Sequence, residues 1–312
     1  MHSNLEDYPR QACTREAQAA PPEAEAGSPG ETPAPEDRRH PRVRWLWPRY
    51  GKAFILVHGI TIAGMIGAGV TWQALAWAAV QYVATMFFVT AGLHRYFSHR
   101  AFKTSRPFQF LLAWCAQCSA QMSVLWWASH HRHHHRFSDQ PADVHSPRQR
   151  GLAYAHMGWL LTEDGHGPYA GIADLQRFPE LRFLDRFRLL PATLLGLGSW
   201  LLLGWPGLFS GFFLALVLSW HATFTINSLA HVIGTRRYDT GDDSRNSLLL
   251  ALLTLGEGWH NNHHRYMRSA RQGFAWWEID LTYYGIKALE ALGLVWDVRE
   301  PPLEILAVAR EG

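Results

Sequence analysis

Two long stretches of the chain contain no Lys, Arg, Asp or Glu. They span residues 53–93 and 189–235 and are 41 and 47 residues long. Since one transmembrane helix needs about 20 apolar residues, each stretch is long enough to cross a bilayer twice. The pattern predicts an integral membrane protein and argues against a soluble globular enzyme.

Each uncharged stretch contains a predicted helix break near its middle. A glycine-rich run at residues 64–69 loosens the first stretch around residues 68–73, and a Gly-Trp-Pro-Gly turn at residues 204–207 divides the second. The glycine-rich run has no strand before it and no acidic residue after it, so we interpret it as a site of close helix packing and not as a nucleotide-binding loop. The breaks predict two helical hairpins, at residues 53–93 and 189–231.

The basic residues favour one orientation of these hairpins. All 29 Lys and Arg residues lie outside the uncharged stretches, and with a net charge of +3 they do not predict nucleic-acid binding. By the positive-inside rule, both hairpins start and end on the cytoplasmic side, and both termini are cytoplasmic. We expect an all-α integral membrane fold in a bacterial inner membrane, with four transmembrane helices under a cytosolic helical cap formed by residues 94–188 and 232–312.

The N-terminal region is expected to lie outside this fold. Most of residues 19–36 are Pro, Ala, Glu and Gly without apolar periodicity, which predicts a disordered tail over residues 1–37 and no signal peptide. Residues 38–52 form a basic collar in which Trp45 and Trp47 stand among arginines. This composition is typical of the cytoplasmic boundary of a membrane.

A third uncharged segment, residues 108–127, is 20 residues long and is a candidate for a fifth transmembrane helix. A crossing here would place the histidines before and after it on opposite sides of the membrane, and the segment holds three glutamines and two serines. We therefore predict a helix lying in the membrane interface. Its Cys115 and Cys118 are interpreted as buried thiols, since no second cysteine pair accompanies them.

Histidine is the second unusual feature, with 18 residues in the chain. Eight of them form three clusters, which are His94 with His99, then His131, His134 and His135, then His260, His263 and His264. Positions i, i+3 and i+4 of a helix lie within about 100° of arc, so we expect each H-x-x-H-H cluster to aim three imidazoles at one point. Two histidines five residues apart are not expected to share a helix face, so the first cluster should straddle a helix end.

Imidazoles gathered in this way bind first-row transition metals, and the lack of carboxylate and thiolate groups in the clusters argues against Ca²⁺ or Mg²⁺. His231, at the end of the second hairpin, brings the number of clustered imidazoles to nine. Nine ligands are too many for one ion, so we predict two metal ions. An adventitious metal-binding tract would explain one cluster but not three clusters and a histidine at a helix end.

These clusters closely resemble the histidine boxes of the membrane fatty acid desaturases, specifically of the acyl-CoA (stearoyl-CoA type) Δ9 branch. The resemblance runs from about residue 51 to residue 297, and its boxes occur in the family's order and spacing. The boxes are HRYFSH at 94–99, HRHHHRFSD at 131–139, NSLAH at 227–231 and GEGWHNNHH at 256–264. Two further similar segments are PADVHS at 141–146 and HMGW at 156–159.

The resemblance implies a di-iron centre held by nine histidines, with four transmembrane helices under a cytosolic cap. Carried over by position, the iron ligands are His94, His99, His131, His134, His135, His231, His260, His263 and His264. Asn227 would hold a water molecule on one iron, and no catalytic residue beyond these is implied. His130 and His133 lie between the ligands on other helix faces and are not expected to bind metal.

The reaction that the resemblance implies removes two hydrogens from adjacent carbons of a saturated acyl chain and leaves a cis double bond. No amino-acid side chain oxidises an unactivated methylene group, so two irons and O₂ would supply the oxidant. Because the chain has no haem, flavin or nicotinamide motif, we expect an external electron donor, a cytochrome-b-type protein or a ferredoxin with its reductase. The expected substrate is a long-chain fatty acyl-CoA in unsaturated fatty acid biosynthesis.

Several residues near the boxes have two interpretations each. Asp143 and Glu257 could orient ligand imidazoles or could serve in capping and ion pairing. His58 and His221 lie inside the predicted transmembrane helices, where we expect them to pack in the neutral state against neighbouring helices. The arginines that could receive CoA phosphates, or contact anionic lipid, are Arg148, Arg150, Arg236, Arg237 and Arg245.

The sequence leaves the acyl carrier and the reaction outcome open. Eukaryotic acyl-CoA desaturases carry an Arg-Asp pair directly before the second box, where this chain has Ser129 and His130. An acyl-lipid or acyl-carrier-protein desaturase is therefore an alternative, as is a di-iron hydroxylase or acetylenase with similar boxes. A non-catalytic metal transporter would need metal-binding residues inside its transmembrane helices, whereas the clustered histidines lie at or beyond the predicted ends.

Overall fold

Helices make up nearly all of the regular structure in the computed structural model, which describes residues 49–162 and 171–311. The predicted tail (1–37) and most of the basic collar lie outside the described residues, which all belong to one contact unit. The elements are α1 (Arg49–Ala68), α2 (Trp72–Phe88), η1 (Val89–Ser98), β1 (Lys103–Thr104), α3 (Arg106–Gln117), α4 (Val124–Phe137), α5 (Pro147–Arg150), α6 (Leu152–His156), η2 (Gly158–Leu161), α7 (Ala173–Gln176), α8 (Pro179–Arg186), α9 (Leu190–Pro206), η4 (Gly207–Phe213), α10 (Leu214–Asn227), η5 (Leu229–His231), α11 (Leu248–Leu253), α12 (His260–Arg265), α13 (Leu281–Ala291), β2 (Val295–Trp296) and α14 (Leu303–Glu311).

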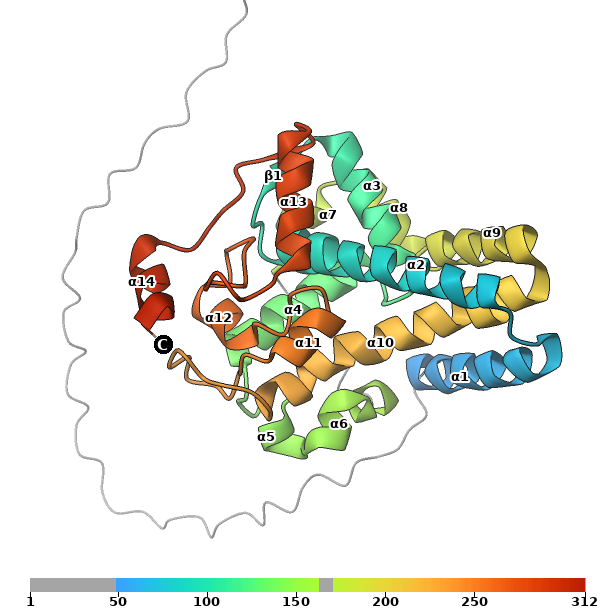
Figure 1. Ribbon diagram of the computed structural model, residues 1–312, viewed down its shortest axis with the longest axis horizontal. Coiled ribbons are helices and arrows are strands. Elements are labelled where there is room, and N and C mark those ends of the chain that lie inside the picture. Colours follow the sequence, from blue (N-terminus) through green and yellow to red (C-terminus); the bar gives the residue numbers. More distant parts are fainter. Residues whose placement is uncertain (1–48, 163–170, 312) are drawn as a thin grey trace, which may run out of the picture. The chain divides into compact units, whose positions relative to one another are not determined.

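The first uncharged stretch forms two helices, α1 and α2, that run in opposite directions (Figure 1). The break falls within residues 68–73, where Gly69 has a φ of 76°, a value that favours glycine. Thr71 then caps α2 by accepting a hydrogen bond from the amide of Ala74. Within the glycine-rich run only Gly64 is a packing site, since the ring of Phe209 lies directly against it.

The second uncharged stretch is folded back on itself at Gly204. This residue has φ 64° and ψ −155°, which no α-helix contains, and α9 and α10 consequently run in opposite directions (Figure 1). The turn is tight because Gly207 lies against the last part of α9, where a Cβ atom would come within 2.4 Å of the Ser199 carbonyl oxygen. The break lies in the predicted Gly-Trp-Pro-Gly turn.

Three helical runs in the described part of the chain are long and apolar enough to cross a membrane, Gly51–Ala68, Trp72–Ser98 and Leu190–His231. The last is 42 residues long and contains the fold at Gly204. Apolar side chains on these runs face outward, with Ile66 80% exposed and Leu201 69% exposed. Such exposure is unfavourable in water but expected in lipid, so the runs fit a membrane protein.

The prediction of a single helix over residues 108–127 is wrong. α3 ends at Gln117 and α4 begins at Val124, and Ala120 and Met122 between them have φ values of 50° and 69°. The amide of Gln117 stabilises this break, because it donates to the Leu184 carbonyl and accepts from the Val124 amide. With 12 residues, α3 is too short to cross a bilayer.

The shorter helices gather at one end of α1, α2, α9 and α10 (Figure 1). Their core contains fully buried apolar residues from η1, α3 and α8, including Phe97, Leu112 and Leu181. β1 and β2 pair antiparallel and join the segment after η1 to the segment after α13. Cys118 is a free, half-buried thiol, and partial burial raises its pKa to about 12, which disfavours the reactive thiolate.

Candidate metal centre

A π-helix positions the first two clustered histidines. The amide of His99 donates to the carbonyl of His94 over 3.2 Å, which is the five-residue hydrogen bond of π-helical geometry. In a π-turn, residues five apart lie nearly above one another, and the two ring centroids are 4.8 Å apart. The prediction that these histidines do not share a face is therefore wrong, because it assumed α-helical spacing.

The nine clustered histidines form two groups, and within each group the candidate ligand atoms all lie within 4.8 Å of one another. The first histidine group contains His94, His99, His131, His135 and His263. The second histidine group contains His134, His231, His260 and His264. The two groups are adjacent, since the rings of His135 and His264 have centroids 4.5 Å apart.

Each H-x-x-H-H box is divided between the two groups, so the prediction that one box aims at one point is wrong. In both boxes the residues at i and i+4 join one group, and the residue at i+3, His134 in α4 and His263 in α12, joins the other. Around a helix axis, i and i+4 are about 40° apart, whereas i+3 lies about 60° away on the other side of i. One box therefore faces two neighbouring centres.

Ring nitrogens of the first histidine group point at one another. Nε2 of His263 lies 3.0 Å from that of His94 and 2.9 Å from that of His135. Nε2 of His131 lies 2.8 Å from that of His99 and 2.9 Å from that of His135. Burial, and then the neighbouring imidazoles, hold the pKa of His99, His131, His135 and His263 well below the usual range. The neutral form that binds metal is thereby favoured.

The second histidine group leaves buried nitrogens unsatisfied. Nε2 of His231 lies 3.1 Å from Nε2 of His260, while Nε2 of His264 and Nδ1 of His260 are buried and have no hydrogen-bond partner among the described residues. Buried polar atoms nearly always have a partner, so converging imidazoles of this kind fit a transition-metal ion in each group.

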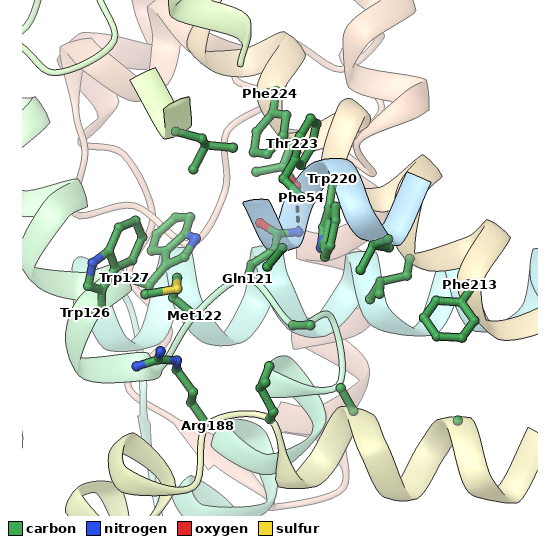
Figure 2. Close-up of a pocket in the computed structure, with 18 of the residues that line it drawn as sticks. Phe54, Gln121, Met122, Trp126, Trp127, Arg188, Phe213, Trp220, Thr223 and Phe224 are labelled. Atoms are coloured by element: carbon green, nitrogen blue, oxygen red, sulfur yellow. Dashed lines mark hydrogen bonds between the residues drawn. The ribbon is translucent and has the colours of Figure 1, made fainter. Parts of the chain in front are cut away.

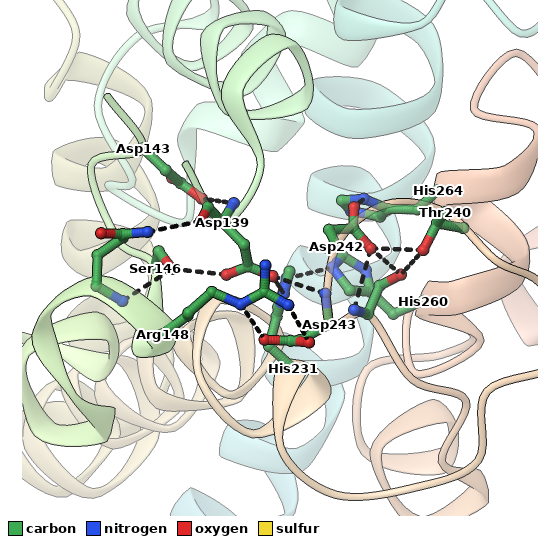
Figure 3. A network of polar contacts seen from close by, with 12 residues as sticks. Asp139, Asp143, Ser146, Arg148, His231, Thr240, Asp242, Asp243, His260 and His264 are labelled. Atoms are coloured by element: carbon green, nitrogen blue, oxygen red, sulfur yellow. Dashed lines mark hydrogen bonds and ion pairs between the residues drawn. The ribbon is translucent and has the colours of Figure 1, made fainter. Parts of the chain in front are cut away.

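Four carboxylates contact these imidazoles on their outer nitrogen, Nδ1, and Figure 3 shows the pairs of Asp139 with His231 and of Asp242 with His264. The pairs are Glu257 with His94, Asp143 with His134 (3.0 Å), Asp139 with His231 (2.8 Å) and Asp242 with His264 (2.5 Å). A carboxylate that accepts a hydrogen bond from Nδ1–H fixes the tautomer of the imidazole and leaves Nε2 free to bind a metal. Orienting an imidazole was one of the two interpretations given to Asp143 and Glu257, whereas Asp139 and Asp242 were not identified from the sequence.

The carboxylates of the second histidine group are held in the ionised state. Burial alone would raise the pKa of Asp139, but hydrogen bonds from His231 and Ser146 lower it to about 2. In the same way, the pKa of Asp242 is lowered despite its burial, mainly by the hydrogen bond from His264. These ionised acceptors favour the tautomer that carries its proton on Nδ1.

A buried arginine supports the first histidine group. Arg95 is fully buried and donates to the carboxylates of Glu257 (3.0 Å) and Asp280 (3.0 Å) and to the carbonyl of Ala270 (2.6 Å). Although burial alone would raise it, contacts with His94 and Arg95 lower the pKa of Glu257 to about 2. The sequence signal for this role is the position of Arg95, which is the first charged residue after the uncharged stretch 53–93.

An apolar cavity of about 820 Å³ adjoins the histidines, and Figure 2 shows part of its lining. His131 of the first histidine group and Asn227, the last residue of α10, line one part of it. Phe213 lies at the opposite end from Trp127 (Figure 2). The volume is within the range of small-molecule sites, about 300–1,000 Å³, and the described lining contains one arginine, Arg188, and no carboxylate.

The sequence profile of the fatty acid desaturases matches residues 70–298. The chain belongs to the fatty acid desaturase family. It is 38% identical over 218 residues to icosanoyl-CoA 5-desaturase of Limnanthes douglasii and 39% identical over 239 residues to hex-5-enoyl-[acyl-carrier protein] acetylenase of Moorena producens. It is also 38% identical over 226 residues to sn-1 stearoyl-lipid 9-desaturase of a Synechocystis species.

These similarities cover 68%, 70% and 70% of this chain, respectively. They cover 61%, 74% and 69% of the three relatives, so the chain spans less than two thirds of the first. Family membership implies an oxidoreductase of lipid metabolism. The names of the three relatives include CoA, acyl-carrier-protein and lipid substrates, so the family does not determine the acyl carrier.

None of the five arginines that were candidates to receive CoA phosphates or to contact anionic lipid lines the apolar cavity. Three are ion-paired and two donate to uncharged oxygens within the protein. The contacts are Arg148 with Asp243, Arg236 with Asp239, Arg237 with Glu278, Arg150 with the Tyr154 hydroxyl and Arg245 with the Gly234 carbonyl. Their position therefore gives no support to headgroup binding at this cavity.

His58 and His221 pack against each other across α1 and α10, as expected. Their Nε2 atoms are 3.0 Å apart, and Nδ1 of His221 lies 3.0 Å from Nε2 of His156. The three imidazoles satisfy one another between apolar helices, which is how polar groups persist in such surroundings. They belong to neither histidine group.

Replacing Asp242 with asparagine should weaken metal binding by the second histidine group about 10- to 100-fold, because the ionised acceptor that orients His264 is lost. The affinity is measured by competition with a chelator of known affinity. Asp239→Asn provides the control, since the Asp239 side chain is 96% exposed in the same segment. Equal affinities of the two variants would contradict an orienting role for Asp242.

Proposed function

We propose that this desaturase uses O₂ to introduce a cis double bond, at the Δ9 position, into a saturated long-chain acyl-CoA in unsaturated fatty acid biosynthesis. The observation that carries the proposal is the shared position of His131, which belongs to the first histidine group and also lines the apolar cavity. A methylene chain in this cavity would lie beside the metal centre.

We propose one iron ion in each histidine group, with Asn227 holding a water molecule on one of them. Two bound irons and O₂ would supply the oxidant that no side chain provides. The protein's own groups hold the site: the imidazoles bind through Nε2, and the carboxylates retain the Nδ1 protons. The apolar cavity excludes water and aligns the acyl chain. Each double bond consumes O₂, two electrons and two protons, and releases two water molecules.

We propose that the chain crosses the membrane four times. The fold at Gly204 supports two crossings by the third candidate run, and the distribution of Lys and Arg supports cytoplasmic termini. The hairpins at residues 53–93 and 189–231 would then present the cap, residues 94–188 and 232–312, to the cytoplasm of a bacterium. An acyl chain would reach the metal centre from within the membrane.

An acyl-lipid is the second candidate carrier, followed by acyl-carrier protein. CoA carries several phosphates, whereas the described cavity lining offers one arginine, Arg188, and Ser129 and His130 replace the family's Arg-Asp pair. One of the relatives is an acetylenase, so formation of a triple bond is a second candidate reaction. Hydroxylation is a third, since a hydroxylase would use the same oxidant.

Expression in a host without its own desaturase, followed by fatty acid profiling, tests the function. We expect a new monounsaturated species whose double bond lies at Δ9, and iron in the purified protein. Hydroxy or acetylenic acids in place of the alkene would show the alternative outcome. The carrier is identified by assaying the purified enzyme with acyl-CoA, acyl-lipid and acyl-carrier protein in separate reactions.

Replacing Ala192 with tryptophan should block the cavity and lower the rate on 18-carbon chains by about 10-fold or more, since inserting bulk into a packed site costs about 1–3 kcal/mol. Ala192 of α9 is 5% exposed and lines the cavity. Leu194→Trp is the matched control on the same helix, because Leu194 is 47% exposed and faces outward. Product profiles over several chain lengths provide the measurement, and equal profiles would show that the cavity does not hold the acyl chain.

A further inference from the structure

A second pocket reaches the first histidine group from the polar side of the molecule. It has a volume of about 510 Å³, and His99 and His135 form part of its lining. Only an imidazole ring therefore separates the pocket from the point where the Nε2 atoms converge. The apolar cavity reaches the same group through a different residue, His131.

The lining of this second pocket is strongly cationic. Five arginines contribute to it, with no Asp or Glu, and we call it the arginine pocket; the five are Arg100, Arg132, Arg136, Arg268 and Arg299. Arg100 and Arg132 are both ion-paired with Asp174.

Three of these arginines have no acidic partner in the part of the chain that the structure describes. Arg136, Arg268 and Arg299 are exposed, and within residues 49–162 and 171–311 no carboxylate forms an ion pair with them. An unpaired cluster of this kind attracts an acidic partner and accelerates its association.

The two openings suit two different reactants. The cavity with one arginine suits an apolar chain, whereas the arginine pocket excludes such a chain because burying unpaired guanidinium groups against methylenes is costly. Since the desaturation proposed above needs two electrons that the chain itself does not supply, a partner must approach the metal centre from outside the membrane.

We propose that the arginine pocket is the docking and electron-entry surface for an acidic electron-carrier protein. The proposal rests on the proposed desaturase function. A pocket of about 510 Å³ admits acidic side chains of a partner, not a whole domain, so the carrier docks over it and places its redox group near His99 and His135. Two one-electron carriers are oxidised per double bond, and their electrons, with two protons from water, reduce O₂ together with the two substrate hydrogens to two water molecules.

The test compares two triple variants of equal charge. Arg136→Gln, Arg268→Gln and Arg299→Gln together change the arginine pocket, and Arg177→Gln, Arg182→Gln and Arg186→Gln together change exposed arginines outside both pockets. An acidic plant-type ferredoxin with its reductase and an acidic b-type cytochrome serve as carriers, and dithionite serves as a small reductant. The ratio of carrier-driven to dithionite-driven desaturation is measured for each protein.

In the arginine-pocket variant we expect the KM for the carrier to rise by about 10- to 100-fold and its dependence on ionic strength to flatten. The metal-free protein should show the same loss in direct binding of oxidised carrier, which gives a readout independent of turnover. The control variant should match the wild type in both measurements.

Three outcomes would overturn the assignment. These are an equal rise of carrier KM in both variants, a rise in the KM for the acyl substrate in place of the carrier, and failure of both acidic carriers to reduce a wild type that dithionite drives. A wild type that forms no alkene even with dithionite refutes the proposed function, while carrier binding that is independent of the three arginines refutes the docking surface.

Discussion

Replacing His263 with alanine should empty the first histidine group of metal and lower desaturation by more than about 100-fold. His263 is 1% exposed, and its Nε2 lies 3.0 Å from that of His94 and 2.9 Å from that of His135. It therefore links imidazoles from η1 and α4. Loss of an outer contact to a ligand costs about 10- to 100-fold in metal affinity, and loss of the ligand itself costs more.

Iron content per chain and the rate of desaturation measure this effect. We expect the iron content of His263→Ala to fall from about two ions to about one, because the second histidine group keeps its ligands. His133→Ala is the matched control from the same kind of box: its Nε2 contacts the Ala142 carbonyl at 2.9 Å, and it belongs to neither group. If both variants lose the same amount of iron, the assignment of His263 is wrong.

The helix breaks could be predicted because their cause is local. An uncharged stretch of 41 or 47 residues is longer than one transmembrane helix, and glycines with positive φ mark where it turns. Gly69 and Gly204 both lie within the predicted breaks. The break between α3 and α4 was missed, because it depends on a hydrogen bond from Gln117 to Leu184, 67 positions away.

The histidines of the site could be identified from their spacing, but their division into two groups could not. Counting at 100° per residue ignores the π-helical turn that brings the rings of His94 and His99 together. It also treats each box as facing one point, whereas α4 and α12 lie together and share two centres. The grouping is a property of how helices pack, which the pattern of one helix does not contain.

Only some of the carboxylates that orient the imidazoles could be identified from the sequence. Asp143 and Glu257 could be named as candidates because each lies within a few residues of a box. Asp139 also lies at the end of a box, but it contacts His231, 92 positions away, which the spacing does not show. Asp242 lies in the segment between η5 and α11, which has no periodic pattern to interpret. A carboxylate in an irregular segment acquires its role only from the tertiary fold.

Replacing Arg95 with methionine should lower the free energy of unfolding by about 3–5 kcal/mol, which is the usual cost of removing one partner from a buried ion pair. Arg95 is fully buried, and Glu257 and Asp280 are 6% and 1% exposed. Without the guanidinium group, two carboxylates remain in a buried environment with no cation to compensate them. Denaturant unfolding of the metal-free protein in detergent measures the loss apart from metal binding.

Two comparisons separate the buried charge from the loss of packing. Arg106→Met is the surface control, since Arg106 is 61% exposed where it pairs with Glu180, and water compensates the carboxylate that remains, so its loss should be much smaller. Adding Asp280→Asn to Arg95→Met removes one uncompensated charge while keeping an oxygen to accept the Tyr283 amide, so it should restore part of the lost stability. If the two substitutions are simply additive in their cost, the destabilisation comes from lost packing of the long arginine side chain and not from unpaired carboxylates.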